Sequence, residues 1–160
     1  MAWKLARQFR ATGTPRPGGS KTAFYNKAAG RAMIVDACKT SKTWRQDVKM
    51  AAIATAEPGA ALLDGCLLLD VVFYLARPAG HYRSGKNAGR LRDSAPPFPS
   101  VKPDTTKLLR STEDALTKIV WVDDARITDQ LARKRYCGQG EPPGAQIAVY
   151  VWVPDAEGDE

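Results

Sequence analysis

Acidic side chains at two places in the stretch 101–129 could hold a metal ion. Asp104 directly follows a proline, and the pair Asp123–Asp124 directly follows the apolar run IVWV. Mg²⁺ prefers carboxylate and water oxygens, and at a phosphodiester such an ion activates water or stabilises the developing charge. If the chain folds back toward the edge of a sheet after IVWV, the acidic pair approaches Asp104. The three carboxylates would then form a Mg²⁺ site, for which Mn²⁺ is a possible substitute.

The segment that connects these acids has the spacing of an amphipathic helix, running from Asp104 to about Lys118. At about 100° per residue one face is predicted to be apolar and to dock on a sheet, and it contains Leu108, Thr112, Ala115, Leu116 and Ile119. The opposite, polar face is predicted to contain Lys107, Arg110, Ser111, Asp114 and Lys118. Arg110 lies two turns along from Asp104, where it could bind the phosphate or the leaving oxygen. Asp114 is ten residues along, about 15 Å, which is too far to share one ion with Asp104.

A plainer interpretation of the same acids remains open. Asp104 could serve only as a favourable negative charge at the positive end of the helix. Asp123–Asp124 could be an ordinary turn. Asp114 could pair with Arg110 or Lys118 at helical spacing. Spacing alone does not decide between this interpretation and a metal site.

The surrounding pattern predicts a single α+β domain over residues 1–160, a mixed sheet with two main helices packed on it. The apolar run 66–76 predicts a central strand buried on both faces. Residues 41–56 predict the first helix, with Trp44 and Val48 on its apolar side. The remaining segments have strand patterns: a first strand at 4–14, a small hairpin built from 24–25 and 32–35, and a C-terminal hairpin that pairs 126–136 with 146–153.

Two basic loops accompany these elements. The first contains the run TPRPGGSK with Arg16 and Lys21, and the second is a long, mobile, proline- and glycine-rich loop at 78–102 with Arg83 and Lys86. A loop of that length inside a domain is usually functional or disordered. Together with Lys102, Lys107 and Arg110, these side chains are candidates for nucleic-acid contacts. The cations of the first helix, Lys42, Arg45 and Lys49, are equally consistent with phosphate contacts and with an ordinary solvated face.

Charge favours a polyphosphate partner. The net charge is +7, with eleven Lys/Arg and two Asp in residues 1–50, whereas residues 136–160 contain five acids and no Lys/Arg. Neutralising phosphates releases counterions and adds affinity that is independent of sequence. Residues 155–160 are predicted to be a solvated acidic tail.

Hydropathy and cysteine content argue against a membrane protein, a secreted protein and a zinc protein. The apolar run near 67–76 is interrupted by Asp70, which argues against a membrane span, and MAWKLARQFR lacks the apolar core of a signal peptide. Three widely spaced cysteines cannot form a complete disulfide framework, so we expect a reduced, cytoplasmic protein. With one histidine and no CxxC, a zinc site of the usual kind is not expected.

The run KPDTTKLLRSTEDALT followed by WVDDARITD resembles the RusA family of Holliday-junction resolvases, small endonucleases common in phages and prophages. Their pattern is roughly (K/R)xDxDNLxK, then DAL, then DD before a strand. The match is specific in residues 102–129 and looser over the rest of the chain. The resemblance implies a homodimer, in a bacterial host cell, that binds four-way DNA junctions and cuts symmetrically related strands with Mg²⁺ in recombination, repair or phage replication.

The resemblance also implies roles for individual residues. Asp104 matches the first metal-binding acid, Asp124 the last, and Asp123 is its neighbour; Arg110 stands at the position of an essential lysine. Thr106 replaces the second acid and Lys107 replaces the asparagine. A hydroxyl is a poorer Mg²⁺ ligand than a carboxylate, and arginine does not give up a proton at neutral pH.

We therefore expect a Mg²⁺-dependent endonuclease of branched DNA, with Asp104, Asp123 and Asp124 on the metal and Arg110 on phosphate. The alternative is a structure-selective DNA-binding protein that has lost catalysis, which Thr106 and Lys107 suggest. An RNA-binding module is less favoured, because the chain lacks the stacked aromatic residues of such modules.

Overall fold

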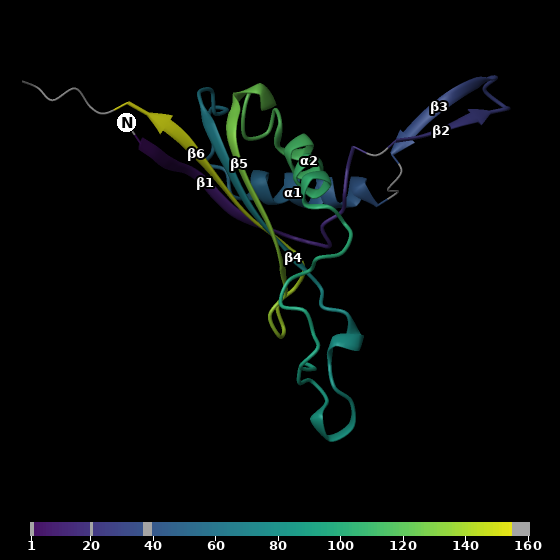
Figure 1. Ribbon diagram of the computed structural model, residues 1–160. Helices are drawn as coiled ribbons and strands as arrows, with labels where there is room; N and C mark the ends of the chain where they lie inside the picture. The colour runs from purple at the N-terminus through teal and green to yellow at the C-terminus, as the bar shows by residue number, and fades with distance from the viewer. Residues whose placement is uncertain (1, 20, 37–39, 155–160) are drawn as a thin grey trace, which may run out of the picture.

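The computed structural model describes residues 2–19, 21–36 and 40–154, and the predicted acidic tail at 155–160 lies outside them (Figure 1). Six strands and two α-helices occur in these ranges. In chain order they are β1 (Ala2–Thr12), β2 (Lys21–Asn26), β3 (Arg31–Asp36), α1 (Ser41–Ala54), β4 (Leu67–Leu75), α2 (Thr105–Leu116), β5 (Ile127–Tyr136) and β6 (Gly144–Val153). Short 3₁₀ turns occur at Ala79–His81 (η1), Gly85–Asn87 (η2) and Asp124–Arg126 (η3).

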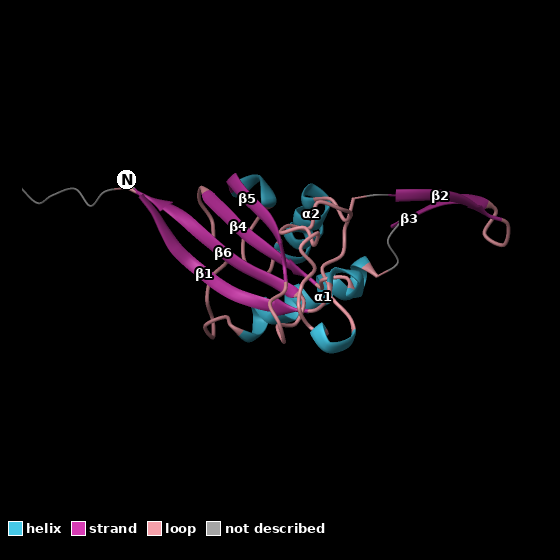
Figure 2. Ribbon diagram, turned by 60° about the horizontal axis from the view of Figure 1, so that its bottom comes forward, coloured by secondary structure: helices cyan, strands magenta, loops and turns pink. Residues whose placement is uncertain are grey.

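Four strands form the main sheet, in the order β1-β6-β4-β5. β4 runs parallel to β5 and antiparallel to β6, and β6 is antiparallel to β1. Figure 2 shows both helices beside one face of this sheet, and their buried side chains belong to the same core as the sheet residues. The predicted α+β fold, with a mixed sheet and two main helices, is therefore confirmed.

The predicted pairing of the last two strands is wrong. β5 and β6 lie on opposite sides of β4, so they do not form a hairpin. The connection of residues 137–143 crosses the end of β4 instead. A connection of this length can form a hairpin or cross over a strand. β4 has two edges with backbone groups that need hydrogen-bond partners, and β5 pairs with one edge while β6 pairs with the other.

β4 is central, as predicted, but it is buried on only one face. Leu67, Leu69, Val71 and Phe73 are fully buried, and the residues that alternate with them are partly exposed. One of these is Asp70, whose carboxylate pairs with the guanidinium of Arg133 on β5. Continuous hydrophobicity suggested two covered faces, but both helices pack on the same side.

The core lies between that face and the two helices. Trp44 and Val48 of α1 and Leu108 and Leu116 of α2 are fully buried there. The indole Nε1 of Trp44 donates to Oγ1 of Thr112 at 3.2 Å, which joins the two helices inside the core. Full burial of each such aliphatic side chain is worth about 1.5–3 kcal/mol, so packing of these helices holds α2 in place against the sheet.

The predicted small hairpin is confirmed as β2 and β3, which pair with each other only and project from the body of the protein (Figures 1 and 2). The predicted first helix is also confirmed, with Trp44, Val48 and Ala52 on its buried side. In the described part of the chain, no helix has the length and hydropathy needed to cross a membrane.

Candidate active site

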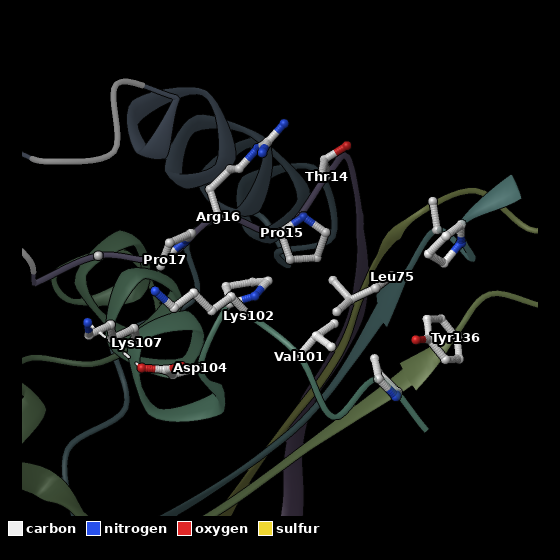
Figure 3. A pocket seen from close by; sticks show the side chains of 15 residues that line it. Thr14, Pro15, Arg16, Pro17, Leu75, Val101, Lys102, Asp104, Lys107 and Tyr136 are labelled. Carbon is white, nitrogen blue, oxygen red and sulfur yellow. Dashed lines mark ion pairs between the residues drawn. The ribbon is translucent and has the colours of Figure 1, made fainter. Parts of the chain in front are cut away.

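A cavity of about 610 Å³ opens where the N-terminus of α2 meets the ends of β4 and β5 (Figure 3). Four separate segments line it: residues 14–18, residues 75–78, residues 99–107, and Tyr136. This volume falls in the range of sites that hold small molecules or parts of larger ligands, about 300–1,000 Å³. Asp104 lies on its rim.

Asp104 is the residue that caps the N-terminus of α2, and its carboxylate makes no capping hydrogen bond. The side chain is 59% exposed, and its Oδ2 lies 3.8 Å from Nζ of Lys107. Two bonds position the segment that precedes it: Nζ of Lys134 on β5 donates to the carbonyl oxygens of Val101 at 2.7 Å and of Pro103 at 3.0 Å. The sheet thus fixes the backbone from which Asp104 projects.

The first basic loop packs against α2. The backbone N–H of Gly18 donates to the carbonyl of Lys107 at 2.9 Å, and Pro15 and Gly18 are buried. Gly19 has a φ of +83°, and a Cβ built there would lie 2.8 Å from Cδ of Arg110. This glycine therefore lets the loop pass beside the arginine whose predicted role is phosphate binding.

Ser111 was predicted on the polar face of α2, toward a cleft or solvent, and is instead fully buried. A Cβ added to Gly18 would lie 3.1 Å from the Cβ of Ser111, so the two chain segments are in close contact. Its Oγ has no hydrogen-bond partner among the described residues. The helical pattern could not reveal this burial, because the loop at 14–19 covers a face of α2 that the sheet does not reach.

The acidic pair lies beyond the other end of α2. Oδ1 of Asp123 accepts a hydrogen bond from the N–H of Ala125 at 2.8 Å, which begins the turn η3. This bond, and a hydrogen bond with Asp124, lower the pKa of Asp123 below its ordinary value. Both aspartates are exposed.

Glu113 is a third acid near this end of the helix, and it was not singled out from the sequence. Its Oε2 accepts a hydrogen bond from Nε2 of Gln130 at 2.8 Å. Partial burial raises the pKa of Glu113, and the charges of Asp124 and Asp114 raise it further, although the Gln130 bond opposes the shift. The sequence pattern of candidate metal ligands did not include Glu113. Its proximity to Asp124 is visible only in the folded chain.

Asp104 and the Asp123–Asp124 pair do not converge within one chain. The twelve residues of α2 stand between them, a rise of about 18 Å. Metal ligands must lie within about 2–2.6 Å of the ion. No group of three or more His, Cys, Asp or Glu suited to a metal occurs in the ranges that the structure describes. The expected return of Asp123–Asp124 toward Asp104 is therefore wrong for a single chain, because the residues after α2 lead into β5 at its far end.

Three of the predicted nucleic-acid contacts gather around the cavity. Arg16, Lys102 and Lys107 all line it, although they come from two distant segments. Figure 3 shows Lys102, Lys107 and Asp104 on one side of it, with Leu75, Val101 and Tyr136 on the other.

The other predicted contacts lie outside that lining. Arg110 follows along α2 against Gly19, and Lys21 begins β2. Arg83 and Lys86 are in the long loop, which extends from the end of β4 away from both helices (Figure 1).

The long loop has internal structure. It contains the turns η1 and η2, and residues 81–83 pair with residues 90–92 through backbone hydrogen bonds. The Arg83 guanidinium also binds the carboxylate of Asp93 at 2.9 Å. Arg83 is therefore already paired with an acid of the same loop.

Comparison with known proteins gives a single family. The family model described as "Endodeoxyribonuclease RusA" matches residues 9–150 of the 160 residues, which includes both acidic positions and all four segments of the cavity. A search of curated proteins finds no match.

Proposed function

This chain belongs to the RusA endodeoxyribonuclease family, and we propose that it is a Mg²⁺-dependent endonuclease that resolves Holliday junctions or related branched DNA. Its setting would be recombination, repair or phage replication, in the cytoplasm of a bacterial host. The observation that carries the proposal is that Asp104 lines an open cavity together with three cationic residues, Arg16, Lys102 and Lys107. A carboxylate and cations at one cavity suit a site that must both bind a phosphodiester and cut it.

The cationic side chains have a direct role in this proposal. Arg16, Lys102 and Lys107 bind phosphates on either side of Asp104, which fixes the scissile bond relative to the acid. Arg110, farther along α2, positions a phosphate but does not act as a general acid, because its guanidinium keeps its proton at neutral pH. When bound, Mg²⁺ supplies an activated water and stabilises negative charge on the phosphate.

The donor set of one chain does not fit this ion, since the described residues contain no group of three or more His, Cys, Asp or Glu suited to a metal. We therefore include the homodimer in the proposal: a second copy would bring its Asp123–Asp124 pair to the Asp104 of the first. Thr106 adds a hydroxyl where the family pattern has an acid. Each complete site would then depend on both chains.

An uncovered sheet face offers apolar surface to a second copy, on the side of the sheet away from α2. The face opposite the two helices exposes Leu5, Leu131 and Trp152, each with more than a third of its surface accessible. Cross-strand register places Leu131 opposite Asp70, on the side away from the core. Exposed apolar surface of this kind often marks an interface.

One contact favours the alternative, a structure-selective DNA-binding protein without catalysis. Lys107 lies 3.8 Å from Asp104 and offsets the charge that a metal ion would need. In this alternative Asp104 is only a helix N-terminal acid that stabilises α2.

Cleavage of a labelled synthetic four-way junction distinguishes these two functions. A linear duplex of the same sequence is the matched substrate, and each is incubated with Mg²⁺, with Mn²⁺, or with EDTA. The proposal expects symmetrical nicks in the junction only when metal is present, and tight junction binding in EDTA. Tight binding without nicks under any metal condition supports the alternative, and equal affinity for junction and duplex contradicts both.

A further inference from the structure

The apolar half of the cavity is larger than phosphate binding requires. A phosphodiester backbone needs cations and hydrogen-bond donors. Beyond Lys102 and Lys107, however, the cavity continues between rings and aliphatic side chains, namely Pro15, Pro78, Pro99, Leu75, Val101 and Tyr136. Pro15 and Pro99 are buried, so these walls are part of the fold.

The aromatic wall is held rigidly. The guanidinium carbon of Arg77 lies 4.1 Å from the centre of the Tyr136 ring, and His81 meets that ring edge-on with centroids 5.5 Å apart. Arg77 is itself fixed, because its Nη1 donates to the carbonyl of Pro96 at 2.9 Å. Figure 3 shows the Tyr136 hydroxyl directed toward the side of the cavity where Val101 and Leu75 lie. The ring therefore needs little reordering to receive a ligand.

The two halves together match a nucleotide. Flat apolar and aromatic walls suit the faces of a nucleobase, and cations at the mouth suit the phosphates on either side of it. A base must leave its stack to enter such a cavity, which costs least where pairing and stacking are already interrupted. The branch point of a junction is such a place.

We infer that the cavity lined by Leu75, Val101 and Tyr136 receives one unstacked nucleobase from the branch point of the DNA, while Arg16, Lys102 and Lys107 hold its flanking phosphates. This inference rests on the proposed function, because it takes branched DNA as the substrate. Capture of the base sets the position of the neighbouring phosphodiester relative to Asp104. Selection of the cleavage position would follow from which base fits.

The test uses the full-length protein in EDTA, so that strand cleavage plays no part. Four-way junctions carry a single 2-aminopurine at each nucleotide beside the branch point in turn. This base fluoresces weakly when stacked and strongly when unstacked. We expect one position to brighten severalfold when protein saturates the junction, and that base to be protected from acrylamide quenching by the cavity walls.

A cavity-filling variant makes the test specific. Ala76 is exposed and lines the cavity just after β4, so Ala76→Leu adds volume there without disturbing a strand. Ala61→Leu makes the same change at an exposed residue outside the cavity. Ala76→Leu should lose the brightening and the protection at that position, and Ala61→Leu should keep both. Should Ala76→Leu fail to fold, Val101→Met, at a residue 62% exposed, makes the same test.

Three outcomes overturn the inference: no position brightens, the bright base is quenched as readily as in single-stranded DNA, or the filled cavity still protects it. These readouts separate it from the proposed function. A protected base in a junction that stays uncut with Mg²⁺ keeps the cavity assignment and contradicts the endonuclease, and cutting without a protected base does the reverse. Failure to bind branched DNA overturns both.

Discussion

Lys134 donates a hydrogen bond from Nζ to the carbonyl of Pro103 at 3.0 Å, and through it β5 fixes the residue that precedes Asp104. The same ammonium group binds the carbonyl of Val101 at 2.7 Å. The sheet thereby positions both the acid at the cavity rim and one of the cavity walls. In the proposed endonuclease, these two bonds would fix Asp104 relative to a bound substrate.

Lys134→Met removes both bonds and keeps the aliphatic stem. We expect the free energy of unfolding to fall by about 1–3 kcal/mol, because two carbonyls lose a charged donor. The rate of junction cleavage should fall by more than the loss of folded protein accounts for, because Asp104 is no longer held in place. Lys4→Met, at an exposed residue of β1 outside the cavity, is the control. Thermal melts and cleavage rates measure the two effects, and a Lys134→Met protein with the wild-type rate would show that the anchor has no functional role.

Cations at the cavity should contribute to DNA affinity through phosphates. Arg16→Gln, Lys102→Gln and Lys107→Gln should each reduce the slope of log affinity against log salt by about 0.9 if one phosphate contact is lost. Lys4→Gln, an exposed residue of β1 outside the cavity, should leave the slope unchanged. Fluorescence anisotropy of a labelled junction over a salt series gives the slopes. If all four variants kept the wild-type slope, the DNA phosphates would not contact the cations of this cavity.

The uncovered sheet face should hold the dimer together. Leu131→Glu places a charge on a side chain that is 51% exposed, on the edge strand β5 of this face. We expect the dimer dissociation constant to rise at least about tenfold, which corresponds to about 1.4 kcal/mol. Leu91→Glu, in the long loop at 45% exposure, is the matched control. Analytical ultracentrifugation compares them; a Leu131→Glu protein as dimeric as the control would exclude this face as the interface.

The raised pKa of Glu113 should make the stability of the protein depend on pH. Its pKa is raised in the folded protein, chiefly by partial burial, so the folded state binds the proton more tightly than the unfolded state does. Stability from this group is therefore greatest below the unfolded-state pKa and falls as pH rises through the folded-state pKa. Glu113→Gln keeps a polar partner for Gln130 and removes the ionisation. It should melt higher than wild type at neutral pH and lose that advantage in acid; a difference that does not change with pH would contradict this.

Hydrophobic periodicity predicted individual elements well. Helical apolar spacing identified α1 and α2, and short apolar runs identified β4 and the β2–β3 hairpin. Most apolar side chains of the hairpin are exposed, whereas for α1, α2 and β4 the pattern reflects burial in the core. It does not say which neighbour provides the burial. The β5–β6 hairpin was predicted from the turn between them, whereas in the fold β4 lies between these strands.

The candidate site was predictable only in part. The family pattern predicts Asp104 and Asp124 as metal ligands, which stays a prediction, and whether they meet depends on where the chain leads after Leu116. Ser111 was assigned to the wrong face because a loop ninety residues earlier covers it. The cavity could not be foreseen, since Pro15, Leu75, Val101 and Tyr136 come from four segments that only the folded chain brings together.

Mixing two inactive variants tests the central claim, an endonuclease whose site needs Asp104 from one chain and Asp124 from its partner. Asp104→Asn and Asp124→Asn should each bind the junction and fail to cut it with Mg²⁺. After the two are unfolded together and refolded, mixed dimers contain one intact site. Cleavage should reappear in the mixture, as nicks in one strand at a time. A mixture as inactive as its components, or full activity in either variant alone, would contradict it.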